Sequence, residues 1–496
     1  MRPQPGIRKA RGGGWRLVTG FLATGFVLAG VCRGQEEAIE DRLVEVTVAY
    51  QEPNPFQPWQ NLQPKQRRGY AIRLGEAQYL TTENLVRNHK LVQLRKARTG
   101  EKLEARVVAA DVRIDLALLT TDGLAARFPA ITVVEKLKRQ DTVSILQFDQ
   151  TDALQRGDGE VLQISIEELP RAPYATLTFS LLTDLNVNGE GAPVVKDGRL
   201  AGLITSYSNS SRTGRMIPYP IVNRFLRDAA RPPYVGSAVA GFSWKVLVDL
   251  VKRNYLGLAG RTGGILVTSC RVGSGAQAVL QPNDVLLEWD GHELDNLGFY
   301  EDPDFGRLQF AYLIHGRRSV GETIPVRLLR EGREQAVKLT LSKLEDAAAL
   351  IPENVERARP AYLVEGGFVL RELDGHFLRS FGGDWQRNVD PRLVHLYVTR
   401  RQDPGTPGER VVVLGGILPD AVNVGYEQFR NHIVERVNGE PVGNMADVFR
   451  LVDRDQHLLS LGLRSVGIDI VLDPSRLDEA NRRLSETYRI PRRRHR

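Results

Sequence analysis

Short runs of alternating or β-branched apolar residues fill the chain from Leu43 to about Arg231. Apolar residues at every second position indicate strands with one buried face, and turns rich in Gly, Asp and Pro separate these runs. The pattern therefore predicts a β-barrel or β-sandwich domain. Its strands are expected at LVEVTVAY, YAIRL, YLTT, KLVQLRK, LEARVVAAD, LALLTT, TVSILQF, VLQISI, ATLTF and GLITSY.

The pattern changes at the end of this region. IPYPIVNRFLRDAA predicts a helix that starts after Pro220 and places Ile221, Phe225 and Leu226 on one face. Arg231-Pro-Pro then reads as a linker. In residues 236 to 345, SWKVLVDLVKRNYLGL and LQFAYLIHG have helical spacing, whereas GGILVTSC, DVLLEWDG and a pair around Glu331-Gly332 have strand spacing. These elements predict a small α+β module.

Residues 361 to 475 repeat this organisation. DVLLEWDGHEL and IVERVNGEPV are both apolar strands that end in an Asp-Gly or Asn-Gly turn before a predicted helix. YLVEGGFVLREL, RVVVLGGIL and GIDIVLD supply further strands. We therefore expect one β-rich domain followed by two similar α+β modules, as the length of 496 residues allows.

The N-terminus resembles a secretory signal peptide. A basic segment precedes an apolar run from Leu17 to Val31, and a polar start follows Gly34. The run is shorter than the roughly 18 to 20 residues that a membrane span needs, so we predict export after cleavage near Gly34. A membrane anchor and lipidation at Cys32 stay open as alternatives.

Charge and cysteine content limit the possible functions. Residues 1–34 carry six basic residues and no acid, so their removal lowers the formal charge from +7 to +1 and weakens a nucleic-acid hypothesis. We interpret residues 477–496 as a solvated basic tail. Cys270 alone remains in the mature chain, so no intrachain disulfide forms. Without a clustered His, Cys and Asp set, the sequence predicts neither a metal site nor a cofactor.

The loop TDLNVNGEGAP, which ends at Pro193, is the main candidate for chemistry. Glycines let a loop turn tightly enough for successive N–H groups to form a donor pocket. In a chymotrypsin-like protease such a loop has the pattern G-[DN]-S-G-G-P, but here Glu190 takes the place of the serine. Taken alone, GEGAP is more typical of a hairpin turn between two strands, and the rest of the chain is what favours the donor loop.

Several motifs in order resemble the HtrA/Deg family, in which a chymotrypsin-like protease domain precedes PDZ domains. The resemblance covers nearly the whole mature chain. It rests on EPNPFQPWQ, YLTTENLV, IDLALL, MIPYPIVNRFLRD, LQPNDVLLEWDG and VNVGYEQFRNHIVERVNGEPVGNM. The implied fold is mainly β with α+β modules: a chymotrypsin-like double β-barrel followed by two PDZ-like domains.

The resemblance also implies positions for the catalytic triad. The aspartate falls on Asp115, whereas the histidine falls on Leu85 and the serine on Glu190, with Gly189, Glu190 and Gly191 forming the oxyanion loop. Leucine cannot accept a proton, and His89 is the only histidine of this domain. Loss of both histidine and serine predicts that acyl-enzyme chemistry is lost. A carboxylate dyad of Asp115 and Glu190 that activates water is the alternative.

The PDZ resemblance implies peptide binding. A PDZ domain adds an extended peptide as a strand and holds its terminal carboxylate in a loop of backbone N–H groups. That loop falls on Val239, Ala240, Gly241 and Phe242 in the first module and on the segment from Glu365 to Phe368 in the second. Glu365 would repel a carboxylate, so we expect the first module to bind peptides and the second to serve assembly. A groove filled by the chain itself stays open for each module.

We therefore expect a signal peptide at 1–34, a degenerate protease domain at 36–232, PDZ-like domains at 233–348 and 361–476, and a basic tail at 477–496. The predicted function is an exported, proteolytically inactive HtrA/Deg homologue of the periplasm or cell envelope. It would bind unfolded polypeptides or protein C-termini in protein quality control, as a homotrimer or larger oligomer. The alternatives are an active endopeptidase with non-standard residues and an envelope PDZ scaffold.

Overall fold

The computed structural model describes residues 39–75, 77–96, 99–121, 131–169, 174–343, 345–354, 358–464 and 466–496. The chain divides into a unit at 1–37 and a unit at 38–496. The predicted signal peptide and Cys32 lie outside the described residues. In the described part of the chain, no helix is long and apolar enough to cross a membrane.

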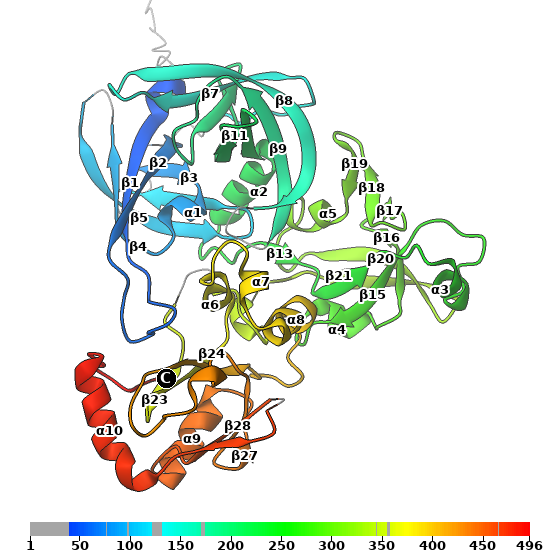
Figure 1. Ribbon diagram of the computed structural model, residues 1–496. Helices are drawn as coiled ribbons and strands as arrows, with labels where there is room; N and C mark the ends of the chain where they lie inside the picture. Colours follow the sequence, from blue (N-terminus) through cyan, green and yellow to red (C-terminus); the bar gives the residue numbers. More distant parts are fainter. Residues whose placement is uncertain are drawn as a thin grey trace, which may run out of the picture. The chain divides into compact units, whose positions relative to one another are not determined.

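Six strands close the first β-barrel in the order β1-β2-β3-β6-β5-β4 (Figure 1). Alternate residues of β1 point into the barrel, where Val44, Val46 and Val48 pack with residues of β2, β3 and β4. This alternation is the period-two pattern predicted for a strand with one buried face. The strands are β1 (Leu43–Tyr50), β2 (Lys65–Arg73), β3 (Gln78–Thr81), β4 (His89–Arg95), β5 (Lys102–Asp111) and β6 (Leu116–Thr120).

A second closed barrel follows in the order β10-β11-β12-β9-β8-β7. Helix α2 (Tyr219–Ala229) comes after its last strand and buries Ile221 and Phe225, as its spacing predicts. The chymotrypsin-like double barrel is therefore confirmed. The strands are β7 (Thr142–Phe148), β8 (Leu154–Glu168), β9 (Ala175–Thr183), β10 (Pro193–Lys196), β11 (Arg199–Ser208) and β12 (Thr213–Pro218).

The first α+β module contains a sheet in the order β14-β15-β16-β20-β21. Its elements are β13 (Ala238–Val239), β14 (Phe242–Lys245), α3 (Leu250–Tyr255), β15 (Ile265–Cys270), α4 (Gly275–Val279), β16 (Val285–Trp289), β17 (His292–Glu293), β18 (Phe299–Asp302), β19 (Gly306–Gln309), α5 (Ala311–His315), β20 (Thr323–Arg330), β21 (Arg333–Thr340) and β22 (Ser342–Lys343). The predicted helical stretch from Ser243 to Leu258 is wrong at its start. Phe242 and Trp244 both pack against Phe310, as alternate residues of a strand do.

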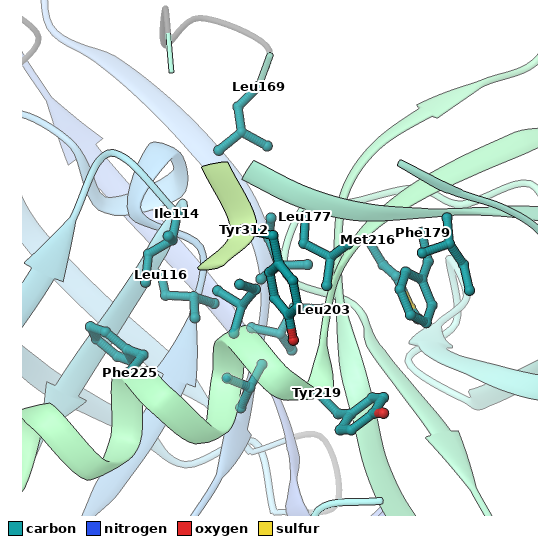
Figure 2. Packing of buried hydrophobic residues seen from close by; sticks show 14 of the residues in the cluster. Ile114, Leu116, Leu169, Leu177, Phe179, Leu203, Met216, Tyr219, Phe225 and Tyr312 are labelled. Atoms are coloured by element: carbon teal, nitrogen blue, oxygen red, sulfur yellow. The ribbon is translucent and has the colours of Figure 1, made fainter. Parts of the chain in front are cut away.

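The second barrel and the first module share one hydrophobic core. Figure 2 shows Tyr312, which belongs to α5, beside Leu177 and Leu203 of the barrel. Phe305, just before β19, contacts Phe179 with ring centroids 5.6 Å apart. Because apolar contacts of this kind stabilise without a directional bond, they join the barrel to the module through ordinary core packing.

The second α+β module has two small sheets, β25-β24-β23-β30 and β27-β26-β28-β29. Its elements are β23 (Tyr362–Glu365), β24 (Phe368–Glu372), α6 (Gly375–Arg379), α7 (Trp385–Asn388), α8 (Pro391–Arg400), β25 (Val412–Ile417), β26 (Val434–Val437), β27 (Glu440–Pro441), α9 (Met445–Asp455), β28 (Ser460–Leu463), β29 (Asp469–Val471), α10 (Pro474–Thr487) and β30 (Arg494–His495).

The interpretation of residues 477–496 as a solvated tail is corrected by the structure. Helix α10 begins at Pro474, ahead of the predicted boundary, and Leu477 and Leu484 on its inner face are buried in the second module. Strand β30 then pairs with β23, where Leu363 lies opposite Arg494. The C-terminal residues are therefore part of the module, because a stripe of apolar side chains lies among their arginines.

If the apolar face of α10 is part of the core, a substitution on that face should destabilise the protein. Leu477→Ala leaves a cavity next to the buried side chains of the second module and should lower the free energy of unfolding by about 2–5 kcal/mol. The matched change at the exposed Arg482, Arg482→Ala, should stay within about 0.5 kcal/mol. Urea unfolding of both variants measures the difference. Equally small effects of the two substitutions would contradict the packed helix and support the interpretation of residues 477–496 as a solvated tail.

Candidate functional site

Asp115 lies in the turn between β5 and β6, with a backbone φ of 52° that non-glycine residues seldom adopt. Its side chain is buried, and Oδ1 accepts a 2.7 Å hydrogen bond from the backbone N–H of Asn84. Burial raises the pKa of Asp115 well above its usual range, and the nearby charge of Glu83 raises it further. Asp115 thus bonds to a backbone N–H and not to an imidazole.

Leu85 belongs to α1 (Glu83–Val86), a single helical turn between β3 and β4. Only 1% of its surface is exposed, and it packs in the core of the first barrel. His89 is exposed on β4 and its Nδ1 lies 2.9 Å from the carbonyl oxygen of Val86. Neither residue therefore supplies an accessible proton acceptor beside Asp115.

Glu190 sits between Gly189 and Gly191 and reaches the same place from the second barrel. Its Oε2 accepts a 2.6 Å hydrogen bond from Asn84 Nδ2. Its backbone carbonyl accepts a 2.8 Å hydrogen bond from the N–H of Tyr70. Asn84 therefore contacts both Asp115 and Glu190. The sequence analysis did not predict Asn84 as a site residue, because the only signal for it is its position next to Leu85.

A buried ion pair on α1 adds charge to this cluster. Arg87 Nε lies 3.0 Å from each carboxylate oxygen of Glu83, one helical turn away. Burial lowers the pKa of Arg87, but its hydrogen bonds to Glu83 and the charge of Glu83 raise it. The charges of Asp115 and Glu190 raise this pKa further, so the net shift is upward. Three carboxyl groups thus act on one buried guanidinium, which offsets part of their negative charge.

Hydrogen bonds hold the glycine loop in place. The side chain of Asn188 accepts from the Tyr70 hydroxyl at 2.7 Å and donates to the Phe148 carbonyl at 2.9 Å. The Asn188 backbone N–H donates to Gln147 Oε1, and that of Gly191 donates to the Ile204 carbonyl. Of the predicted oxyanion loop, Gly191 therefore has its N–H committed to the strand behind it.

The loop also needs glycine for steric reasons. Gly191 has a φ of +78°, and a Cβ there would lie 2.2 Å from the carbonyl oxygen of Tyr70. Gly69 on β2 forms an isolated parallel bridge with Glu190, and a Cβ on Gly69 would lie 2.4 Å from the Glu190 carbonyl. The two chain segments approach each other more closely than side chains allow.

The predicted peptide loop of the first module, from Val239 to Phe242, runs from the last residue of β13 to the first residue of β14. Val239 and Ala240 are buried, and the Phe242 ring packs against Trp289 and Phe310. Among the described strands, β14 pairs only with β15, which leaves one edge of β14 without a neighbouring strand. That edge is where an added peptide strand would pair.

The corresponding loop of the second module is filled by the chain itself. Strand β24 lies between β23 and β25, so both of its edges are paired. The Gly366 N–H donates to Asn481 of α10 at 2.9 Å, and its carbonyl accepts from Asn423 at 2.7 Å. Glu365 is 2% exposed and lies 3.0 Å from His457 Nδ1. The described residues thus occupy the place where a peptide carboxylate would bind.

The described residues contain no cluster of three or more His, Cys, Asp or Glu side chains that could hold a metal ion. The acidic groups of the candidate site are bonded instead to Asn84 and Arg87. The arrangement therefore offers carboxyl groups and backbone donors for chemistry, with a carboxylate and not a serine hydroxyl at position 190.

The PDZ domain family matches residues 351–496. "Protease Do-like 4, mitochondrial" from Arabidopsis thaliana is 24% identical and covers 90% of this chain and 84% of its own length. "Protease Do-like 2, chloroplastic" from the same plant is 24% identical and covers 84% of this chain and 69% of its own. Among solved structures, "HtrA-type protease AlgW with decapeptide" is 21% identical, covers 62% of this chain and 97% of its own, and has a TM-score of 0.47.

The raised pKa of Asp115 predicts how stability depends on pH. A carboxyl whose pKa is higher in the folded state than its ordinary 3.8 holds its proton more tightly when folded, so stability falls as pH rises above that value. Asp115→Asn keeps an oxygen for the Asn84 N–H and carries no charge. We expect this variant to be more stable relative to the parent at about pH 7 than at about pH 4.

Urea unfolding of both proteins at the two pH values measures this difference. The control is Asp149→Asn, because Asp149 is exposed and its pKa is lowered, which gives the opposite pH trend. An Asp115→Asn effect that is the same at both pH values would contradict a raised pKa.

Proposed function

Because the chain is a homologue of the HtrA, or Do-like, serine proteases with a PDZ domain, we propose that it is a proteolytically inactive member of this group that binds polypeptides. The observation that carries the proposal is the hydrogen bond from Asn84 to Glu190, at the position expected for the nucleophile. Leu85, at the position expected for the histidine, is buried in an apolar core. Serine-protease chemistry lacks both its nucleophile and its base.

Magnitudes support this proposal. Removing any one member of a serine-protease triad typically leaves only about 10³- to 10⁴-fold catalysis over water. The remaining route is a pair of carboxyl groups that activates water, with Asp115 and Glu190 as candidates. The raised pKa of Asp115 and the influence of Glu190 on it are the observations that favour this alternative. Against it, both groups already accept hydrogen bonds from Asn84.

A cleavage assay separates the two proposals. We expect the purified mature chain to leave a fluorescently labelled unfolded protein intact over hours, and the Asp115→Ala, Glu190→Ala double variant to behave identically. Turnover by the parent that disappears in the double variant would establish the carboxylate alternative and reject inactivity. Turnover that persists in both proteins would point to a contaminating protease. Such a contaminant is identified when the cleavage activity and the purified chain separate during chromatography.

Peptide binding is proposed for the first PDZ-like module only. The unpaired edge of β14 next to the loop from Val239 to Phe242 supports this assignment. In the second module, the corresponding strand β24 is paired on both sides and Asn481 takes the Gly366 N–H. We propose that unfolded segments or protein C-termini add to β14, as a chaperone or adaptor in protein quality control would require.

Capture of a terminal carboxylate gives the second test. Peptides with a free C-terminus should bind the full chain at least about tenfold more tightly than the same peptides with an amidated C-terminus, because a hydrogen bond to a charged group contributes about 1.5–3 kcal/mol. Phe242→Ala should weaken binding of the free form, since this ring lines the loop. Fluorescence anisotropy measures both affinities. Equal binding of the two peptide forms would reject the carboxylate loop.

Binding assays with a set of denatured proteins and of C-terminal peptides distinguish a chaperone from a scaffold. Binding to many denatured proteins favours quality control, whereas one tight C-terminal ligand favours an envelope scaffold with a fixed partner.

We further propose export after cleavage near Gly34 and assembly into a trimer or larger homo-oligomer. Apolar residues between Leu17 and Val31 support export. The mitochondrial and chloroplastic relatives make transport into an organelle the competing destination for this chain.

A further inference from the structure

The last residues of the chain, 492–496, lie along β23 of the second module (Figure 1). We call these residues the C-terminal segment. Its strand β30 pairs antiparallel with β23, where His495 lies opposite Tyr362. The Val364 N–H donates a 2.7 Å hydrogen bond to the Arg493 carbonyl. Because a strand edge binds an extended peptide through main-chain bonds of this kind, the C-terminal segment lies on β23 as a peptide ligand would.

Two carboxylates of the module bind arginine side chains of the C-terminal segment. Asp453, near the end of α9, pairs with Arg494 and accepts a 2.9 Å hydrogen bond from Arg496. The Arg493 guanidinium lies 3.8 Å from the carboxylate of Glu365, the last residue of β23. Pairs of arginine and carboxylate are charge-assisted and directional. The edge of β23 and the end of α9 thus contact both the main chain and the arginine side chains of the segment.

Aromatic rings add to these contacts. The guanidinium carbon of Arg496 lies 5.6 Å from the centroid of the Phe449 ring on α9. The His495 ring centroid lies 5.9 Å from that of Tyr362. A planar guanidinium pairs with carboxylates and packs on aromatic faces better than an ammonium group does. The surface therefore favours arginine over lysine at equal charge.

The C-terminal segment is held more weakly than the helix before it. Ile490 is buried in the module, whereas none of the residues from 491 to 496 is buried. The side chains of Arg494 and Arg496 are 40% and 69% exposed, and exposed ion pairs contribute only about 0–1 kcal/mol each. A segment with few buried contacts opens at a small free-energy cost. We therefore expect the segment to exchange with a free peptide of similar sequence.

The short connection from Ile490 limits which chain the C-terminal segment can reach. Six residues follow Ile490, and even fully extended they span at most roughly 20 Å. This length reaches β23 of the same module, but a second copy only where two such modules touch. A competing occupant is therefore a segment of another protein.

We propose that β23 and Asp453 bind an extended, arginine-rich segment of another protein, in competition with the C-terminal segment of this chain. The C-terminal segment covers the edge of β23 until the partner segment displaces it. This surface differs from the glycine-containing loops of both modules, because the pairing strand is β23 and no terminal carboxylate takes part. The proposal does not depend on the carboxylate binding proposed for the first module.

Fluorescence anisotropy with a labelled, C-terminally amidated RRRHR peptide tests the surface. A chain that ends at Pro491 should bind one peptide saturably. The full chain should bind it at least about tenfold more weakly, because its tethered segment competes at an effective concentration of about millimolar. In the shortened chain, Asp453→Asn should weaken binding about 3- to 10-fold, because two exposed ion pairs are lost. Asp478→Asn, at an exposed carboxylate of α10, is the matched control and should leave the affinity unchanged.

A second variant avoids the truncation. Full-length chain with Arg494→Ala and Arg496→Ala holds its own segment less tightly, so it should bind the free peptide about 3- to 10-fold more tightly than the parent. Thermal unfolding confirms that each variant is folded. Phe242→Ala, in the loop of the first module, should not change the affinity for the amidated peptide. A KKKHK peptide of equal charge should bind at least about threefold more weakly than RRRHR.

Four outcomes would overturn the proposal. They are absence of saturable binding to the shortened chain, equal binding by the parent and the variants that release the segment, an affinity that Asp453→Asn leaves unchanged, and equal binding of KKKHK and RRRHR. Peptide binding that Phe242→Ala abolishes would assign the peptide to the first module instead. Loss of a homo-oligomer on truncation would assign β23 to the C-terminal segment of a second copy and would likewise reject another protein as the partner.

Discussion

Two hydrogen bonds donated by Asn84 define the candidate site. Its backbone N–H bonds to Asp115 and its side-chain amide bonds to Glu190, so one residue joins a carboxyl of each barrel. Helix α1 is only four residues long and has no side-chain hydrogen bond at its N-cap. Its position therefore depends on these bonds and on the buried Leu85 side chain. The apolar and polar faces of this one turn hold the two barrels together at the site.

Close approach of the backbone gives the same site its second constraint. The parallel bridge between Gly69 and Glu190 leaves no room for a Cβ on Gly69, whose place is bounded by the Glu190 carbonyl and the Leu85 side chain. Asn188, fixed by Tyr70 and Phe148, holds the other side of the loop. The loop therefore keeps its shape through main-chain and side-chain bonds that require neither a serine nor a histidine. A protein can lose catalysis at such a site without losing the fold around it.

Sequence reasoning located the first barrel well because each of its strands carries period-two alternation over a buried face. It missed β10, which has four residues, and β12, whose TGRMIP sequence does not alternate. Sequence reasoning did not predict helix α10, because many arginines surround the apolar stripe of Leu477 and Leu484. The contacts of Asn84 and of Asp453 could not be found from spacing, since tertiary structure alone brings these residues to their partners. Triad positions came from the family resemblance and remain predictions.

The two α+β modules differ in how the strand before the glycine-containing loop pairs. In the second module, two glycines connect β23 directly to β24, and Glu365 lies opposite Phe368. The edge of β24 that faces β23 is therefore paired. In the first module, β13 has only two residues and pairs with β22 near the end of that module. This different pairing leaves β14 with β15 as its one described neighbour. An unpaired strand edge presents main-chain donors and acceptors in the spacing of another strand. The strand that precedes each loop therefore decides whether the next strand keeps a free edge, and the loop residues alone do not decide it.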